Sequence, residues 1–226
     1  DKDGNATGFE ADVISAIFND VKGDLKSYVF EKVDEGYELE KDGGFTDSTG
    51  KEYSAGLLLG AVSKNNGTFN EDYSFTQPLI TDRVVAVTAN DSDIKTYADF
   101  SGKKAVVVGD VAESAFDAQA QISSVCAEII EENDIEAALT LVDKGDADVV
   151  IVNELTYMPL NKGDNYNVLS GELDTIEYVI ACAKYSGWKD SINEAVREMK
   201  SESYGNGDEF TPLVEKYFGY NASSFN

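Results

Sequence analysis

Residues 128–153 of the chain read EIIEENDIEAALTLVDKGDADVVIVN. Two short apolar runs, Ile129-Ile130 and Asp148–Val152, predict strands on either side of one helix. The helix is expected over Asp134–Lys144, and Gly145 is placed to end it. Its inward positions, spaced as on one helical face, are Ile135, Ala138, Leu139 and Val142. A strand, a helix and a second strand in this order predict a parallel pair joined by a right-handed crossover.

The same alternation continues on both sides of this stretch. Upstream, we expect a helical turn over Tyr97–Gly102, a strand over Lys104–Val108, and a turn followed by a helix over Gly109–Gln121. Downstream, Ile176–Ala183 is apolar enough for one further buried strand. The pattern as a whole indicates the α/β class.

The two ends of the chain are less regular. Near the start, Gly8–Val21 predicts an amphipathic helix, and the polar, glycine-rich Asp34–Tyr53 predicts a hairpin or a long loop. Leu57–Val62 and Arg83–Thr88 predict buried strands. The final part predicts two helices with apolar faces formed by Ile192, Ala195, Val196 and Met199, and by Phe210, Leu213, Val214, Tyr217 and Phe218.

Composition excludes several classes of protein. The 226 residues are 42% hydrophobic and 11% aromatic, which is typical of a globular protein, and their net charge is -25. Such a charge argues against nucleic acid as a partner, and against docking on an anionic membrane through basic residues. No apolar run is long enough to span a bilayer. A solvated acidic coat is the ordinary explanation of the charge, and it does not identify a ligand.

The chain offers few residues for metal or nucleophile chemistry. It has no histidine, and its two cysteines, Cys126 and Cys182, stand far apart. No metal site and no Cys/His nucleophile is therefore expected, and no cofactor either. The cysteines could form a disulfide or remain thiols; thiols are favoured because Cys182 lies in an apolar strand pattern.

Two local motifs do not by themselves identify a binding site. Asp1, Asp3 and Asn5 imitate the start of a calcium loop, but the loop's glycine and final glutamate are missing. Val108–Glu113 combines a strand end, a glycine turn and a helix start, which can offer backbone N–H groups to an anion or be an ordinary turn. It lacks the further glycines of a dinucleotide site or a P-loop. The abrupt opening at Asp1 is typical of a trimmed or processed start.

Five segments, in order, resemble those of a known family. They are Gly8–Val13 in the opening helix, Tyr73–Leu79 before a crossover strand, Ala98–Lys104, Gly145–Val150, and the closing Ile192–Gly219 with Tyr217-Phe218-Gly219 at its end. In these segments the chain resembles the amino-acid type (family 3) of bacterial extracytoplasmic solute-binding proteins, which have the type II periplasmic-binding-protein-like fold. The resemblance covers most of the chain, and its specificity lies in the ordered set.

The resemblance implies two α/β lobes joined by two hinge crossover strands, with a ligand in the cleft between them. Lobe one would comprise residues 1–87 and 185–226, and lobe two residues 88–184. The hinges would lie at Arg83–Thr88 and Tyr178–Ala183, and the tail helices would pack on lobe one. The family's first strand and its pocket aromatic would precede Asp1, so lobe one should show an exposed sheet edge unless part of Asp34–Tyr53 fills the gap.

The resemblance also implies a set of ligand-binding residues. From lobe one they are Gly60, Ala61 and Ser63, together with Phe69, which either stacks on the solute or only packs locally. From lobe two they are Ala112, Glu113, Asn153 and Glu154. The family's carboxylate-binding arginine would fall near Thr68 or Phe69, where no arginine stands. The acidic residue that meets the α-ammonium is replaced by Asn153, which can accept a hydrogen bond but cannot neutralise a charge. Arg83 could substitute for the arginine, but a hinge or surface ion pair is the favoured role for it.

The expected function is capture of a small polar solute, amino-acid-like or related, for the membrane permease of an ABC importer. The protein would be extracytoplasmic, either periplasmic or anchored at the cell surface. A sensor domain of a histidine kinase or receptor is the main alternative: a lipoprotein cysteine before Asp1 would favour the importer, and a transmembrane helix the sensor. A clamp that has lost its small-molecule ligand is also open. A dehydratase is known on this fold, but Glu113 and Glu154 have no evident base partner, so no enzyme is expected.

Overall fold

The computed structural model describes residues 6–20, 28–32, 38–39, 45–46, 49–53, 56–60, 62–63, 73–160, 165–201 and 207–219. The chain divides into two compact units: unit 1 comprises Asp1–Thr81 and Glu177–Asn226, and unit 2 comprises Asp82–Ile176. The divisions fall inside the strands β6 (Ile80–Ala89) and β11 (Asp174–Tyr178), slightly before the expected lobe boundaries. The expected boundaries, 1–87 with 185–226 and 88–184, stay a prediction.

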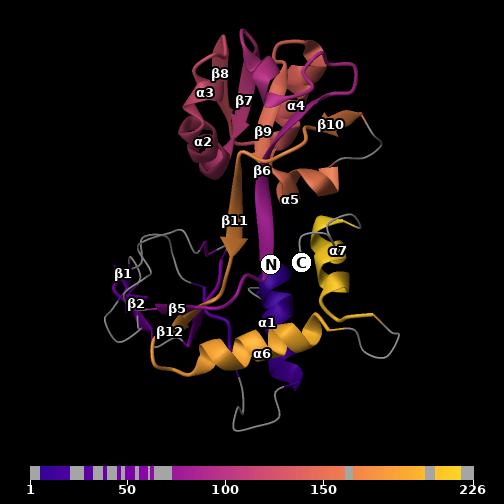
Figure 1. Cartoon of the computed structure of the whole chain (residues 1–226). Helices are drawn as coiled ribbons and strands as arrows, with labels where there is room; N and C mark the ends of the chain where they lie inside the picture. The colour runs from indigo at the N-terminus through magenta and orange to yellow at the C-terminus, as the bar shows by residue number, and fades with distance from the viewer. Residues whose placement is uncertain are drawn as a thin grey trace. The chain divides into compact units, whose positions relative to one another are not determined.

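Unit 2 is built around a six-stranded sheet in the order β10-β6-β9-β7-β8, with β11 paired to β6. Strands β7 (Lys104–Val108), β8 (Glu128–Glu132) and β9 (Val149–Asn153) are parallel, whereas β6 and β10 (Tyr166–Val168) complete the sheet with antiparallel pairing. The crossover helices are α2 (Gly109–Ala118), α3 (Ala120–Ser123) and α4 (Ile135–Lys144), drawn around these strands in Figure 1. The predicted β-α-β arrangement is confirmed.

Helix α4 shows how the local sequence produces this packing. Its predicted inward face (Ile135, Ala138, Leu139 and Val142) is buried in one cluster with Val106 of β7 and Val150 of β9. Asp134 caps the helix start, since its Oδ1 accepts a hydrogen bond from the Ala137 N–H at 2.8 Å. The helix ends at Gly145, whose φ of 74° lies in the left-handed region that favours glycine.

Unit 1 has two smaller sheets among its described residues. One has the order β4-β12-β5, formed by Leu57–Leu58, Ala181–Ala183 and Tyr73–Phe75, and the pairing is antiparallel throughout. The other has the order β1-β2-β3, formed by Glu38–Leu39, Phe45–Thr46 and Glu52–Tyr53. The described strands of the Asp34–Tyr53 region therefore pair with one another and do not join the β4-β12-β5 sheet.

Two predicted strands were wrong in extent. The apolar run Ile176–Ala183 forms two strands, β11 and β12, rather than one. The residues between them bond elsewhere: the Val179 N–H donates to the Val62 carbonyl at 2.9 Å, and the Ile180 N–H donates to Thr76 Oγ1 at 3.0 Å. Leu57–Val62 was expected as one strand, but the ladder covers only its first two residues. Both errors have the same cause. A continuous apolar run predicts that a segment is buried, but it does not predict which segment its backbone will hydrogen-bond to.

The tail helices return to the N-terminal helix, as predicted. α6 (Trp188–Met199) and α7 (Thr211–Phe218) both pack on α1 (Phe9–Asp20), and the three helices can be followed in Figure 1. The ring of Phe9 lies 5.6 Å from that of Phe210 and 5.2 Å from that of Phe218. Asp12 adds polar contacts, because its Oδ2 accepts from both the Lys216 ammonium and the Tyr217 hydroxyl at 2.6 Å.

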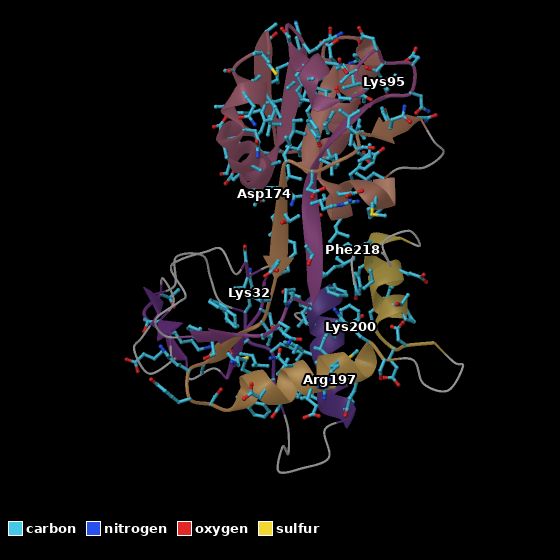
Figure 2. All side chains as sticks on the ribbon, in the orientation of Figure 1. Lys32, Lys95, Asp174, Arg197, Lys200 and Phe218 are labelled. Atoms are coloured by element: carbon cyan, nitrogen blue, oxygen red, sulfur yellow. The ribbon has the colours of Figure 1, made fainter. Side chains whose placement is uncertain are left out.

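A lysine links the end of α6 to the start of β6 within unit 1. Figure 2 labels Arg197 and Lys200 at this end of the helix. The Lys200 ammonium donates to the Leu79 carbonyl at 2.9 Å and lies 4.5 Å from the centre of the Phe210 ring. Burial lowers the pKa of Lys200. The polypeptide just before β6 is therefore held to the tail helices.

Both cysteines are free thiols, as favoured from the sequence. Cys182 is buried in β12, and burial raises its pKa to about 12, which keeps it protonated at neutral pH. Among the described residues, no helix has the length and apolar character needed to cross a bilayer.

Replacing Asp134 by alanine tests the predicted cap of α4. The substitution removes the acceptor of the Ala137 N–H, and we expect the free energy of unfolding to fall by about 1 kcal/mol. Urea denaturation monitored by circular dichroism measures the loss. Glu136→Ala, an exposed change in the first turn of the same helix, is the control and should stay within about 0.5 kcal/mol of wild type. Equal losses in the two variants would contradict the capping role.

Candidate functional site

The carboxyl ends of the parallel strands of unit 2 meet at one edge of its sheet. From β7 the chain crosses to β8 on one side, and from β8 it crosses over β7 to β9 on the other side. The direction of the connections therefore reverses between β7 and β9. In open α/β sheets, ligands bind beyond the carboxyl ends of strands at such a switch point. This edge is the candidate site of unit 2.

The expected lobe-two residues all lie at this edge. Ala112 and Glu113 belong to the first turns of α2, which follows β7 and packs along β9. Asn153 is the last residue of β9, and Glu154 is the first residue of the short helix α5 (Glu154–Tyr157). The sequence thus placed these four residues in one region of one unit.

A buried carboxylate that the sequence analysis did not single out organises the end of β9. Asp82, on β6, is only 2% exposed. Its Oδ1 accepts hydrogen bonds from the backbone N–H of Leu155 at 3.0 Å and from its neighbour Arg83 at 2.7 Å. Its Oδ2 accepts from the Asn153 side-chain amide at 3.0 Å. Asp82 therefore fixes the turn from β9 into α5.

The electrostatic state of Asp82 reflects opposing effects. Burial raises the pKa of its carboxyl group above the ordinary value of 3.8, while the hydrogen bonds from Leu155, Asn153 and Arg83 act in the opposite direction. The burial effect is the larger, so the net shift is upward. Ionisation of Asp82 therefore lowers the free energy of unfolding of the protein.

Arg83 and Glu154 form an ion pair beside Asp82. The Arg83 Nε lies 2.6 Å from Glu154 Oε2, and the Glu154 residue is 7% exposed whereas the Arg83 side chain is 41% exposed. Of the two roles considered for Arg83, the ion pair is the one observed. The carboxylate of Glu154, which was expected to contact a ligand, is therefore already bonded to Arg83. Through this ion pair, Glu154 attaches the first residue of α5 to β6.

Helix α2 presents a different environment at the same edge. Ala112 is fully buried, so neither its side chain nor its backbone is exposed at this edge, and it supports the helix start from beneath. Glu113 is partly buried, and the negative charge of Glu131, in β8, is the main cause of its raised pKa, followed by desolvation and by Asp117 and Asp110. Mutual repulsion among these carboxylates means that a cation near Glu113 would be favoured.

The expected lobe-one residues belong to unit 1 and are partly described. The Gly60 N–H donates to Glu10 Oε2 at 2.9 Å, so α1 holds the segment after β4 in place. Gly60 has a φ of 121°, which a residue with a side chain rarely adopts. Ser63 is partly buried and forms an isolated antiparallel bridge with Tyr178. Ala61 and Phe69, and Thr68 beside it, lie outside the described residues.

The signal that could have revealed Asp82 is its position in the strand pattern. Residues 80–89 read ITDRVVAVTA, an apolar strand interrupted by one charged pair. Val84 lies opposite Asn153 in the ladder, and the antiparallel register carries Asp82 past the end of β9 to the start of α5. A charge in an otherwise buried strand is costly unless it is paired, so it marks a specific partner.

No protein-family model and no curated protein sequence matches the chain, but solved structures do. The L-cystine solute receptor of Neisseria gonorrhoeae, in an unliganded open conformation, is 18% identical with a TM-score of 0.67, covering 99% of this chain and 88% of that one. The GluR0 ligand binding core in complex with L-glutamate is 18% identical with a TM-score of 0.63, covering 96% and 91%. The substrate binding protein of an amino acid ABC transporter is 20% identical with a TM-score of 0.55, covering 94% and 88%.

These likenesses extend over nearly the whole chain, and they concern the fold. The two-lobed α/β fold of these solute-binding structures is therefore the fold of this chain, as the resemblance of the sequence indicated. The identities are low, so the individual binding residues of those proteins do not transfer to this chain by alignment alone.

Replacing Asp82 by asparagine should change how stability depends on pH. Because burial raises the folded-state pKa of Asp82, the wild type is favoured below the unfolded value and loses that advantage as pH rises through the folded pKa. The difference in unfolding free energy, wild type minus Asp82→Asn, should therefore decrease from about pH 4 upward. Urea denaturation at a series of pH values measures it.

Asp93→Asn is the matched control. A hydrogen bond from Lys103 lowers the pKa of Asp93, so the same difference for this variant should decrease as pH falls. The two variants remove the same charge from the same unit and should give slopes of opposite sign. Slopes of the same sign would contradict the assignment of Asp82 as a buried, desolvated carboxylate.

Proposed function

We propose that this chain, with the two-lobed α/β fold of amino-acid-binding periplasmic proteins, is an extracytoplasmic solute-binding protein. It captures a small polar solute, amino-acid-like or related, and does no chemistry on it. The observation that carries the proposal is the likeness to solute-binding structures over 94–99% of the chain. In proteins of this kind, a ligand bound by both lobes shifts the population toward a closed state.

The described residues restrict the solute. The candidate edge of unit 2 contains Asp82, Glu113 and Glu154, and its one described cation, Arg83, already pairs with Glu154. A free α-amino acid brings a carboxylate that must be desolvated and paired, and an unpaired buried charge costs several kcal/mol. We therefore propose an uncharged or cationic solute, with Asn153, Glu113 and the backbone near Ala112 as its unit 2 contacts. Gly60, Ala61, Ser63 and Phe69 are the proposed contacts from unit 1.

The proposed partner is the membrane permease of an ABC importer, and the proposed location is periplasmic or anchored at the cell surface. The likeness to the substrate binding protein of an amino acid ABC transporter supports this role. The likeness to the GluR0 ligand binding core supports a second candidate, a sensor domain that uses the same clamp. The full-length polypeptide distinguishes the two, because a sensor is fused to a signalling module and an importer's binding protein is not.

A thermal-shift screen tests the binding function. Amides, sugars, polyamines and small peptides should include a solute that raises the melting temperature, and standard free amino acids should shift it little. A solute present at about 100 times its dissociation constant adds about 2.7 kcal/mol of stability. Calorimetry on the best solute then gives its affinity.

Asn153→Ala should weaken binding of that solute, whereas Asn167→Ala, an exposed change on β10 in the same unit, should not. If no solute in the screen stabilises the protein, the clamp has lost its small-molecule ligand and the proposal is wrong. Micromolar binding of an ordinary amino acid that survives replacement of Arg83 would contradict the restriction to uncharged or cationic solutes.

A further inference from the structure

The hydrogen bonds of Asp82 determine which way the Asn153 carboxamide faces. Asp82 Oδ1 accepts from two backbone N–H groups, and Oδ2 accepts from Asn153 Nδ2 at 3.0 Å. An ionised carboxylate can only accept hydrogen bonds. The end of the carboxamide that meets Asp82 must therefore be its NH2 group, as the hydrogen bond from Nδ2 shows.

The opposite end of the same carboxamide is its carbonyl oxygen. Asn153 is partly exposed and is the last residue of β9, at the carboxyl edge of the sheet. Within the part of the chain that the structure describes, the Asn153 Oδ1 accepts no hydrogen bond. A group that approaches this side chain from the edge therefore meets an acceptor.

The surrounding charges favour the same kind of ligand group. The guanidinium of Arg83 pairs with Glu154 at 2.6 Å, and its charge acts on Asp82 only as the smallest of the effects on that carboxyl group. A carboxylate that accepts from the amide NH2 also polarises the amide and makes its carbonyl oxygen a stronger acceptor. The negative charge of Asp82 thus lies on the NH2 side of the Asn153 carboxamide, opposite the carbonyl oxygen that faces the edge.

We propose that Asp82 is a positioning residue that fixes the polarity of this subsite, so that Asn153 takes a hydrogen-bond donor of the solute and rejects a carboxylate. The donor is an ammonium, an amide N–H or a hydroxyl group. This inference rests on the proposed function, because it describes one subsite of the solute site. It also explains how an asparagine can stand where an acidic residue was expected: the carboxylate is supplied from the neighbouring strand.

The pairing predicts that Asp82→Asn inverts the subsite. The introduced carbonyl oxygen would keep the hydrogen bonds from the Leu155 and Arg83 backbones, so the introduced NH2 would face Asn153. Two NH2 groups cannot bond to each other, and the Asn153 carboxamide should rotate to present its oxygen inward. Its NH2 would then face the edge, and the subsite would become a donor.

Two simple probes measure this polarity in the full chain by NMR: propylammonium chloride, which donates, and sodium propionate, which accepts. In the wild type, propylammonium should shift the side-chain ¹⁵N–¹H signals of Asn153 and propionate should not. In Asp82→Asn, the dissociation constant for propylammonium should rise about tenfold, which corresponds to about 1.4 kcal/mol, and propionate should become the better probe. Asp93→Asn removes the same charge from an exposed position and should behave as the wild type.

Asn153→Leu provides a second variant should Asp82→Asn fail to fold. It removes the acceptor and leaves Asp82 its two backbone donors, so propylammonium should no longer shift the backbone signal of Glu154. A wild type that prefers propionate, or an Asp82→Asn protein with unchanged preference, overturns the inference. The probes need only the carboxyl edge of unit 2, so they can succeed where the solute screen fails; that combination refutes the proposed function and keeps the polarity of the subsite.

Discussion

The pairing of β9 on both of its edges is the constraint on which unit 2 depends. β9 is bonded in parallel to β7 and antiparallel to β6, and its first four residues are almost completely buried. A strand paired on both sides cannot shift its register without breaking two ladders. Its end at Asn153 is therefore a fixed point, and the residues that follow it, from Glu154 onward, leave the sheet at a defined place. The positions of Asn153 and Glu154 in the candidate site are therefore fixed by the pairing of this strand.

The sequence predicted the regular part of unit 2 well because its signals are local. The face of α4, its stop at Gly145 and the strand Lys104–Val108 each follow from apolar spacing or from one residue with a special backbone requirement. Local consistency of this kind is what makes a sequence specify one fold. The family resemblance then indicated the architecture from the order of such segments, although pairwise identity to the three solved structures named above is only 18–20%.

The site was predicted less completely because its determinants are not local. Asn153 and Glu154 were identified from position, but their partners, Asp82 and Arg83, lie 71 residues earlier in the chain. The spacing of apolar residues along the sequence cannot predict a hydrogen bond between two strands that are so far apart in sequence. The split of Ile176–Ala183 into two strands depends on Thr76 and Val62, and the Thr76–Ile180 hydrogen bond joins residues 104 positions apart. Part of the expected unit 1 site, Ala61 and Phe69, lies outside the described residues, so its geometry stays a prediction.

The way in which the chain is divided between the units has a consequence for the order of folding during synthesis. Unit 2 is one continuous segment, Asp82–Ile176, so all the strands of its parallel core are available once that segment has left the ribosome. Unit 1 needs Glu177–Asn226 as well, because β12 lies between β4 and β5 and the last two helices pack on α1. The N-terminal segment of unit 1 must therefore wait, with the apolar side chains of Phe9 and Ile14 uncovered, until Glu177–Asn226 has been synthesised. The inserted unit matures before the unit that encloses it in sequence, and the waiting N-terminal segment is the part of the nascent chain most in need of protection from aggregation.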